Sequence, residues 1–168
     1  ALAAYSAMGY RKFEVFTSWA KSAFDYRGDP EPYLALGREY GMRFTSLHLP
    51  PVTEDYDASL AEARKAIEFA AAVGAGIVLY KAKTRDLYVR AAGAVLDAAE
   101  RLGVTPVLQN HFGTAVQTLD DVREVLAGVA DARLRSLLEV GHFHSAGVPW
   151  REALEALGGR IALVHVKD

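Results

Sequence analysis

Six short apolar runs of five or six residues, most of them rich in β-branched or aromatic side chains, alternate along the chain with Ala-, Leu-, Glu- and Arg-rich segments. Runs of this length and composition predict β-strands. They recur roughly every thirty residues, which leaves room for a helix between strands, so the pattern predicts right-handed βαβ crossovers and a mostly parallel sheet. The predicted strands cover residues 12–16, 43–48, 76–80, 105–109, 136–140 and 161–165.

Capping residues mark the ends of the helices predicted between these strands. Asp57, Asp86 and Thr118 stand where N-caps are expected, because their side chains can accept a hydrogen bond from the first helical turn. Glycines follow four helical segments, where a left-handed residue commonly ends the last turn. The predicted helices cover residues 2–8, 32–40, 59–73, 87–102, 119–127 and 150–157, and the terminating glycines are Gly41, Gly74, Gly103 and Gly158.

The composition is that of an ordinary globular protein. Of the 168 residues, 51% are hydrophobic and 24% are charged, and no Pro-, Gly- or Ser-rich stretch marks a linker, so we expect a single domain over residues 1–168. There is no cysteine, which excludes disulfides, thiolate metal sites and cysteine nucleophiles.

The charge balance bears on the partners. There are 19 Lys and Arg against 21 Asp and Glu, so the chain lacks the basic excess typical of nucleic-acid binding, and small neutral or anionic substrates fit better. The longest apolar stretch, 67–80, is interrupted by Glu68, Gly74 and Gly76 and is too short to span a membrane. No signal sequence is visible, and we therefore expect a cytoplasmic protein.

Six strands are compatible with an open doubly wound sheet or with part of an eight-stranded barrel. The segment after Phe16 is neither a dinucleotide fingerprint nor a phosphate-binding loop, which disfavours a nucleotide-binding open sheet. Polar residues stand at or near the ends of all six strands, and a barrel gathers such residues around one axis. They are Glu14, His48, Lys81, Gln109, Glu139 and His165.

Three ordered motifs resemble successive strand ends of the xylose isomerase-like TIM barrels. They are 107–114 (VLQNHFGT), 137–142 (LLEVGH) followed by Ala146-Gly147, and 161–168 (IALVHVKD). The stretch 110–118 is most similar to the inosose dehydratase branch, which has a similar His-x-Gly-Thr segment. The resemblance implies an incomplete (β/α)8 barrel of about six βα units that lacks the first and eighth strands. The open edges of such a sheet would favour association, for example as a homo-oligomer.

The resemblance also implies a metal site. In the family, metal ligands stand at the ends of the fifth to eighth strands, usually as Glu, Asp, His and Glu; the matching positions here are Gln109, Glu139 and His165, with the fourth beyond Asp168. Oxygen and nitrogen ligands of this kind suit a divalent ion such as Mn²⁺, Mg²⁺, Co²⁺ or Zn²⁺. Gln109 is a weaker, neutral ligand and cannot accept a proton, which disfavours an epimerisation that uses it as one of two bases.

Further residues are candidates for catalysis. His142 follows Glu139 by three residues and titrates near neutrality, so it is a candidate for proton transfer, with Glu139 beside it. Lys167 could place a positive charge against a developing enolate, or simply pair with Asp168 or another acid.

We interpret four residues as candidates for substrate binding and three others as solvated. Each candidate also has a structural alternative, such as a packed aromatic ring or a hydrogen-bonded core histidine. The substrate candidates are Glu14, Trp19, His48 and His111, and the residues expected in solvated loops are Lys81, Lys83 and His144.

These features favour an enzyme that binds a small polyol, keto-sugar or cyclitol and removes a proton α to a carbonyl, with a divalent metal at the barrel mouth. Isomerisation, epimerisation and dehydration share this first step, so an inosose dehydratase-like lyase is an alternative. A non-catalytic relative that binds a small molecule or acts as a scaffold is another. Metal-dependent cleavage at abasic DNA sites is disfavoured, because it needs a basic groove.

Overall fold

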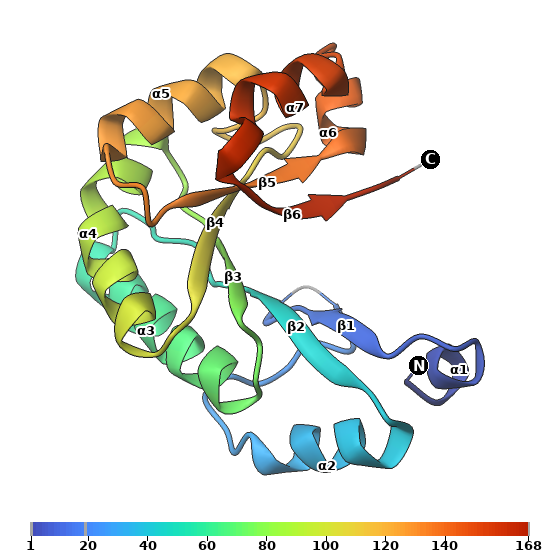
Figure 1. The fold of residues 1–168 in the computed structure, drawn as a ribbon. Coiled ribbons are helices and arrows are strands. Elements are labelled where there is room, and N and C mark those ends of the chain that lie inside the picture. Colours follow the sequence, from blue (N-terminus) through green and yellow to red (C-terminus); the bar gives the residue numbers. More distant parts are fainter. Residues whose placement is uncertain (1, 19, 168) are drawn as a thin grey trace.

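A single parallel sheet of six strands forms the centre of the computed structural model, which describes residues 2–18 and 20–167. The strands lie in chain order and curl into an open half-barrel (Figure 1). All six predicted strands are confirmed, with boundaries that differ by no more than one residue, and so is the incomplete (β/α)8 fold. The strands are β1 (Lys12–Val15), β2 (Arg43–His48), β3 (Ile77–Tyr80), β4 (Thr105–Gln109), β5 (Arg135–Glu139) and β6 (Ile161–His165).

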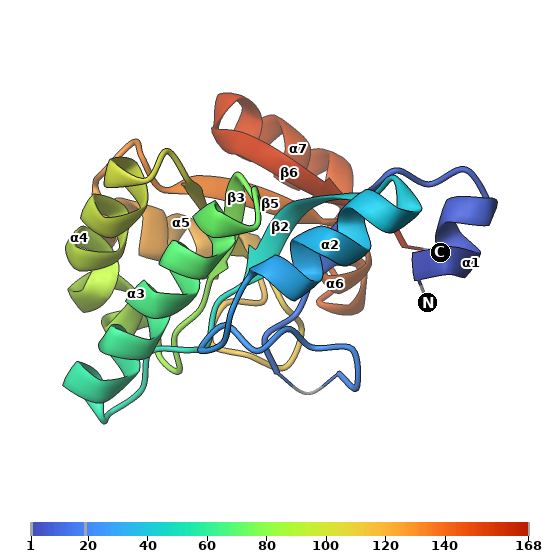
Figure 2. The same cartoon turned by 90° about the horizontal axis from the view of Figure 1, so that it is seen from below.

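Helices connect consecutive strands and cover the outer face of the curl. Figures 1 and 2 show α3, α4 and α5 on this convex side, as expected when every crossover has the same hand. The six predicted helices are confirmed, and a short helix that we did not predict, α6, follows β5 directly. The helices are α1 (Leu2–Ala7), α2 (Glu31–Tyr40), α3 (Tyr56–Ala72), α4 (Arg85–Arg101), α5 (Leu119–Val129), α6 (Val140–Ser145) and α7 (Trp150–Leu157), followed by the 3-10 turn η1 (Gly158–Arg160).

The predicted caps are correct at one N-terminus and wrong at two. Thr118 caps α5, and its hydroxyl accepts a hydrogen bond from the backbone N–H of Asp121 at 3.2 Å. Asp57 and Asp86 instead lie inside the first turns of α3 and α4, which begin earlier, after Asp55 and Thr84. A negative charge is still favourable there, because it faces the positive end of the helix dipole. All four predicted terminating glycines have a positive φ.

Apolar side chains pack on both faces of the sheet, as expected for parallel strands. The larger cluster lies between the sheet and the outer helices and includes Val78, Ile67 and Val95. A smaller cluster inside the curl consists of Leu79, Val107 and Leu137, none of them more than 1% exposed. The inner face is therefore apolar at the middle of β3, β4 and β5.

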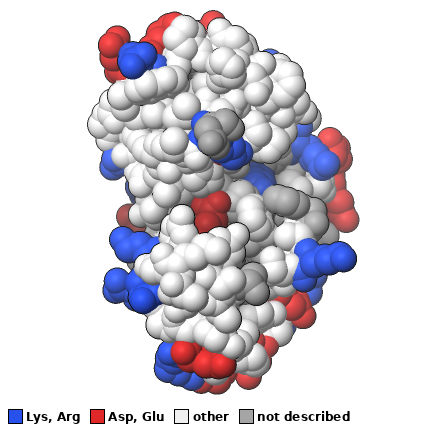
Figure 3. Space-filling view, turned by 90° about the vertical axis from the view of Figure 1, so that its right-hand side faces the viewer, with Lys and Arg blue, Asp and Glu red and all other residues white. Residues whose placement is uncertain are grey.

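The open side of the half-barrel is visible in Figure 3. Most charged side chains lie around its periphery, while both acidic and basic atoms are visible near the centre. In the part of the chain that the structure describes, no helix has the length and apolar character needed to cross a membrane.

Candidate active site

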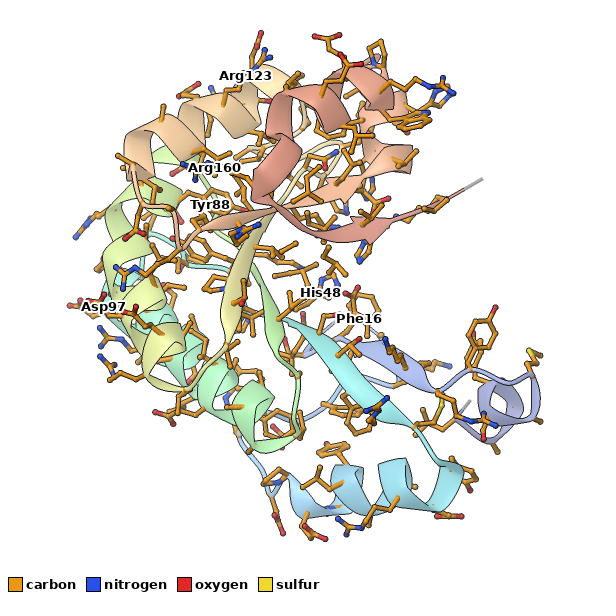
Figure 4. All side chains as sticks on the ribbon, in the orientation of Figure 1. Phe16, His48, Tyr88, Asp97, Arg123 and Arg160 are labelled. Carbon is orange, nitrogen blue, oxygen red and sulfur yellow. The ribbon has the colours of Figure 1, made fainter. Side chains whose placement is uncertain are left out.

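The carboxyl ends of the six strands meet at one edge of the sheet, and polar side chains occupy that edge. Figure 4 places His48 and Phe16 on the open side of the curl, where their rings lie 4.3 Å apart between centroids. A barrel mouth of this kind is where substrates bind in TIM-barrel enzymes. The side chains at this edge are Glu14, His48, Lys81, Gln109, Glu139 and His165.

Strands β1 and β2 and the residue after β3 form a chain of hydrogen bonds. Nε2 of His48 lies 2.8 Å from Oε1 of Glu14, and Nζ of Lys81 lies 2.7 Å from Nδ1 of His48. Since a carboxylate only accepts and an ammonium only donates, His48 is neutral and carries its proton on Nε2. Burial lowers the pKa of His48, and the nearby charge of Lys81 lowers it further, against the opposing effect of Glu14.

Lys81 is not the solvated residue that we predicted. Its side chain is half-buried against His48, and burial lowers its pKa to about 8. Lys83 is exposed, as predicted. Its position at the end of a buried strand, which Lys81 shares with the other polar residues of this edge, was the better guide to its surroundings.

His165 on β6 bridges two carboxylates that are far apart in sequence. Its Nδ1 lies 2.8 Å from Oε2 of Glu139, and its Nε2 lies 3.2 Å from Oε2 of Glu14. Burial opposes protonation of the ring, but the two acceptors outweigh burial and raise the pKa of His165 to about 9. Burial likewise opposes ionisation of Glu14 and Glu139, and hydrogen bonds led by that of His165 lower both carboxyl pKa values nevertheless. The three groups therefore form a charged cluster, and His165 is its cation.

Glu139 is fully buried, and its backbone is fixed by a residue to which we assigned no role. The side chain of Asn110 accepts a hydrogen bond from the Glu139 N–H at 3.0 Å and donates one to the Glu139 carbonyl at 3.1 Å. Oε2 of Glu139 also lies 3.3 Å from Nζ of Lys167. The Lys167 side chain packs closely against Gly141, because a Cβ added to Gly141 would lie 3.1 Å from the Lys167 Cβ. Oε1 of Glu139 is buried without a hydrogen-bond partner among the described residues.

The rings of the two remaining histidine candidates lie against each other at the mouth, tilted by 36°. The rings of His111 and His142 lie 3.8 Å apart between centroids, and Nε2 of His142 is 3.5 Å from Nζ of Lys167. Burial lowers the pKa of His142, and the charges of His111 and Lys167 act in the same direction. His144 is exposed as predicted, but it lies in α6 and not in a loop, since the chain turns directly into a helix after Glu139.

Gln109 lies in a cavity of 450 Å³ beside the ends of β3 and β4. Among the described residues, its side chain forms no hydrogen bond to Glu139 or His165. It lies together with Lys81, Lys83, Tyr88, His111 and Thr114 around this cavity.

Two residues named in the predictions, Trp19 and Asp168, lie outside the described residues. Within residues 2–18 and 20–167, no three His, Asp or Glu side chains have the spacing to hold a metal ion as they stand.

Comparison with known proteins identifies similar chains. The inosose dehydratase of Bacillus licheniformis is 35% identical over 72 residues, which are 43% of this chain and 24% of that protein. The D-allulose 3-epimerase of a Methylomonas species has the same fold, with a TM-score of 0.81 at 20% identity over 99% of this chain and 65% of that one. A xylose isomerase-like TIM barrel protein from Mycobacterium smegmatis, solved in complex with magnesium, gives a TM-score of 0.79 at 19% identity. The match covers 99% of this chain and 65% of that one.

The chain thus spans about two thirds of the length of these solved structures. A family model described as a xylose isomerase-like TIM barrel matches residues 2–168, nearly the whole chain. The strand order, the curl and the polar mouth all agree with this match. The chain belongs to the xylose isomerase-like TIM barrel family.

Proposed function

We propose that this chain provides the mouth of an enzyme that removes a proton α to the carbonyl of a sugar or cyclitol, as an isomerase or epimerase. The observation that carries the proposal is the cluster of Glu14, His165 and Glu139, in which a buried carboxylate retains one oxygen without a partner among the described residues. Buried polar atoms are normally paired, so such an oxygen indicates a ligand site. The related epimerase and dehydratase support this class of chemistry.

His142 is the proposed proton acceptor. Its lowered pKa keeps the imidazole neutral at pH 7, and a neutral ring can take a proton. Lys167 lies near both His142 and Glu139, so its ammonium group can stabilise negative charge that develops on the substrate oxygen. Gln109 cannot accept a proton, and the proposal therefore uses one base on this side of the substrate.

The donor set fits a divalent metal ion, because the unpaired Glu139 Oε1 supplies a buried anionic oxygen. Glu139 and His165 would hold it, and Gln109, which lines the neighbouring cavity, is the third predicted ligand. Mn²⁺, Mg²⁺, Co²⁺ and Zn²⁺ are all compatible with oxygen and nitrogen ligands. When bound, such an ion would polarise the substrate oxygens next to the reacting carbon. Both ring nitrogens of His165 donate to carboxylates here, so ligation would require His165 to release one proton.

The proposed role of Gln109 can be tested separately. Gln109→Glu adds a negative charge and is expected to tighten Mn²⁺ binding, since hard cations prefer anionic oxygen. Calorimetric titration of the two proteins measures the difference. Equal affinities would show that Gln109 is not a ligand.

The function itself is tested by exchange of substrate protons with solvent. We expect the protein, supplied with each of the four metals in turn, to incorporate deuterium from D₂O next to the carbonyl of at least one ketose or inosose, measured by NMR. His142→Asn should slow this exchange by about 10²- to 10⁴-fold. Absence of exchange with every sugar and cyclitol would contradict the proposal, and release of water together with exchange would identify the dehydratase alternative.

A further inference from the structure

We propose that the cavity beside β3 and β4 is an anion subsite, in which Lys81 and the Gln109 amide bind a carboxylate or phosphate group of the substrate. This inference rests on the proposed function, because it assigns the anionic group to the same substrate that reacts near Glu139 and His142. It names a class of substrate: acidic sugars or cyclitols, or their phosphate esters.

The first argument is the charge of the cavity wall. Two lysines and a histidine line it, and none of its lining residues is an Asp or a Glu. The chain as a whole has more acidic than basic residues, 21 against 19. The cavity therefore departs from the average charge of the molecule toward the positive side, which favours an anionic ligand.

The second argument is that no carboxylate of the described residues contacts Lys81 directly. Over residues 2–18 and 20–167, no carboxylate lies within ion-pair distance of Nζ of Lys81, whose hydrogen-bond partner is the neutral ring of His48. Lys167 and Lys65, by contrast, pair with Glu139 and Glu62. Withdrawing an ammonium group from water is costly, and the lowered pKa of Lys81 reflects that cost, which the charge of Glu14 on the far side of His48 offsets only in part. A bound anion would remove it.

The third argument is the amide of Gln109. This side chain is only 7% exposed, it lines the cavity, and it forms no hydrogen bond within the described part of the chain. Its NH₂ group can donate to an anionic oxygen. A glutamate at this position would repel the same anion, so Gln109 and Lys81 are suited to one ligand.

The fourth argument is that the neighbouring loop is ordered without the side chains of Lys81, Lys83 and Gln109. The N–H of His111 donates to the Val116 carbonyl at 2.7 Å, and the hydroxyl of Thr114 donates to the His111 carbonyl at 2.8 Å. The loop is therefore closed by its own hydrogen bonds, and Lys81, Lys83 and Gln109 remain available to a ligand.

The test uses three probes that differ in charge: inorganic phosphate, D-gluconate and the neutral polyol D-glucitol. Calorimetry or NMR titration of the whole protein should show binding of phosphate, gluconate or both. Lys81→Met is expected to weaken that binding about tenfold or more, since hydrogen bonds between charged groups are the strong ones. Lys81→Arg, which keeps the charge, should lose less, and Gln109→Glu should also weaken anion binding. The stronger of the two anions identifies phosphate or carboxylate as the natural group.

Lys65→Met is the matched control, because Lys65 is an exposed lysine on α3 that already pairs with Glu62. It should leave anion binding unchanged, and Lys81→Met should leave glucitol binding unchanged. The inference is overturned if neither anion binds, if Lys65→Met weakens anions as much as Lys81→Met, or if Gln109→Glu binds them as tightly as the parent. If Lys81→Met fails to fold, the anion affinities of Lys81→Arg and Gln109→Glu test the inference instead.

Failure of this inference and failure of the proposed function give different results. Deuterium exchange without a Lys81-dependent preference for anions would leave the function standing and remove the subsite. Anion binding that depends on Lys81, without exchange on any substrate, would leave the subsite standing and remove the proposed function.

Discussion

The two ends of the sheet contain charged residues in very different surroundings. At the amino-terminal end, Arg133 lies 3.0 Å from Asp97, 2.6 Å from Glu100 and 2.7 Å from Asp131, so the chain itself supplies its partners. Asp97 lies on the outer side of the molecule, away from the mouth (Figure 4). At the mouth, one oxygen of Glu139 has no hydrogen-bond partner among the described residues. No carboxylate of these residues lies within ion-pair distance of Nζ of Lys81.

This difference separates stability from function. A charged group whose partners all come from the chain needs no ligand. A buried charged group that lacks a partner is costly unless a ligand supplies one. In TIM barrels the carboxyl ends of the strands bear the active site and the amino ends serve stability. We expect variants at the mouth to affect chemistry, and variants at the amino end to affect folding.

The largest expected effect is that of Glu139→Gln at the mouth. Loss of the buried carboxylate should slow deuterium exchange by about 10²- to 10⁴-fold, because that charge positions His165 and Lys167 at the reacting group. NMR exchange rates measure it, and Glu152→Gln, an exposed position on α7, is the control. Unchanged exchange in Glu139→Gln would remove the functional assignment of the mouth.

Leu134→Ala tests the amino-terminal end. Leu134 is fully buried just before β5, and its truncation should lower the free energy of unfolding by about 2–5 kcal/mol through the cavity it leaves. Denaturant unfolding measures the change, with the volume-conserving Leu134→Met expected to cost less than about 1.5 kcal/mol. The exchange rate per folded molecule should not change. If exchange fell by more than the unfolded fraction of the protein explains, the assignment of stability to the amino end and chemistry to the mouth would be contradicted.

A smaller effect is expected at Thr118, which follows the mouth loop but serves the fold. Its hydroxyl caps α5, so Thr118→Ala should lower the free energy of unfolding by about 1 kcal/mol. Thr118→Ser retains the hydroxyl and should remain close to the parent. If Thr118→Ala altered exchange instead of stability, the mouth would extend into α5.

The smallest effect concerns Asp121 and appears only in acid. Burial opposes ionisation of this carboxyl, but hydrogen bonds from the Thr118 and Gln117 backbone and the charge of Arg85 outweigh it and lower the pKa. A lowered folded-state pKa contributes stability that is complete above the unfolded-state pKa of about 3.9 and is lost as the pH falls through the folded-state value. Unfolding curves below pH 4 should therefore show a shallower loss of stability in Asp121→Asn than in the parent. Parallel curves would show that Asp121 makes no such contribution.

Much of the fold could be predicted because its signals are local. A buried parallel strand requires an apolar run, and a helix end requires a cap or a glycine, so strand and helix positions follow from short segments. Two caps were wrong because Asp57 and Asp86 are equally favourable inside a first turn, and the sequence does not distinguish these positions. The helix α6 was missed because its six residues are too few for a periodic pattern.

The sequence by itself determined the order of strands and helices, the half-barrel class and the polar residues at the strand ends. Only the tertiary structure decided which of these residues meet. Glu14 and His165 are 151 positions apart and touch because the sheet curls, which no local pattern records. The same holds for Lys81: whether an ammonium group is solvated or half-buried beside a histidine depends on the neighbouring strand, since burial is a property of packing and not of a residue's own segment.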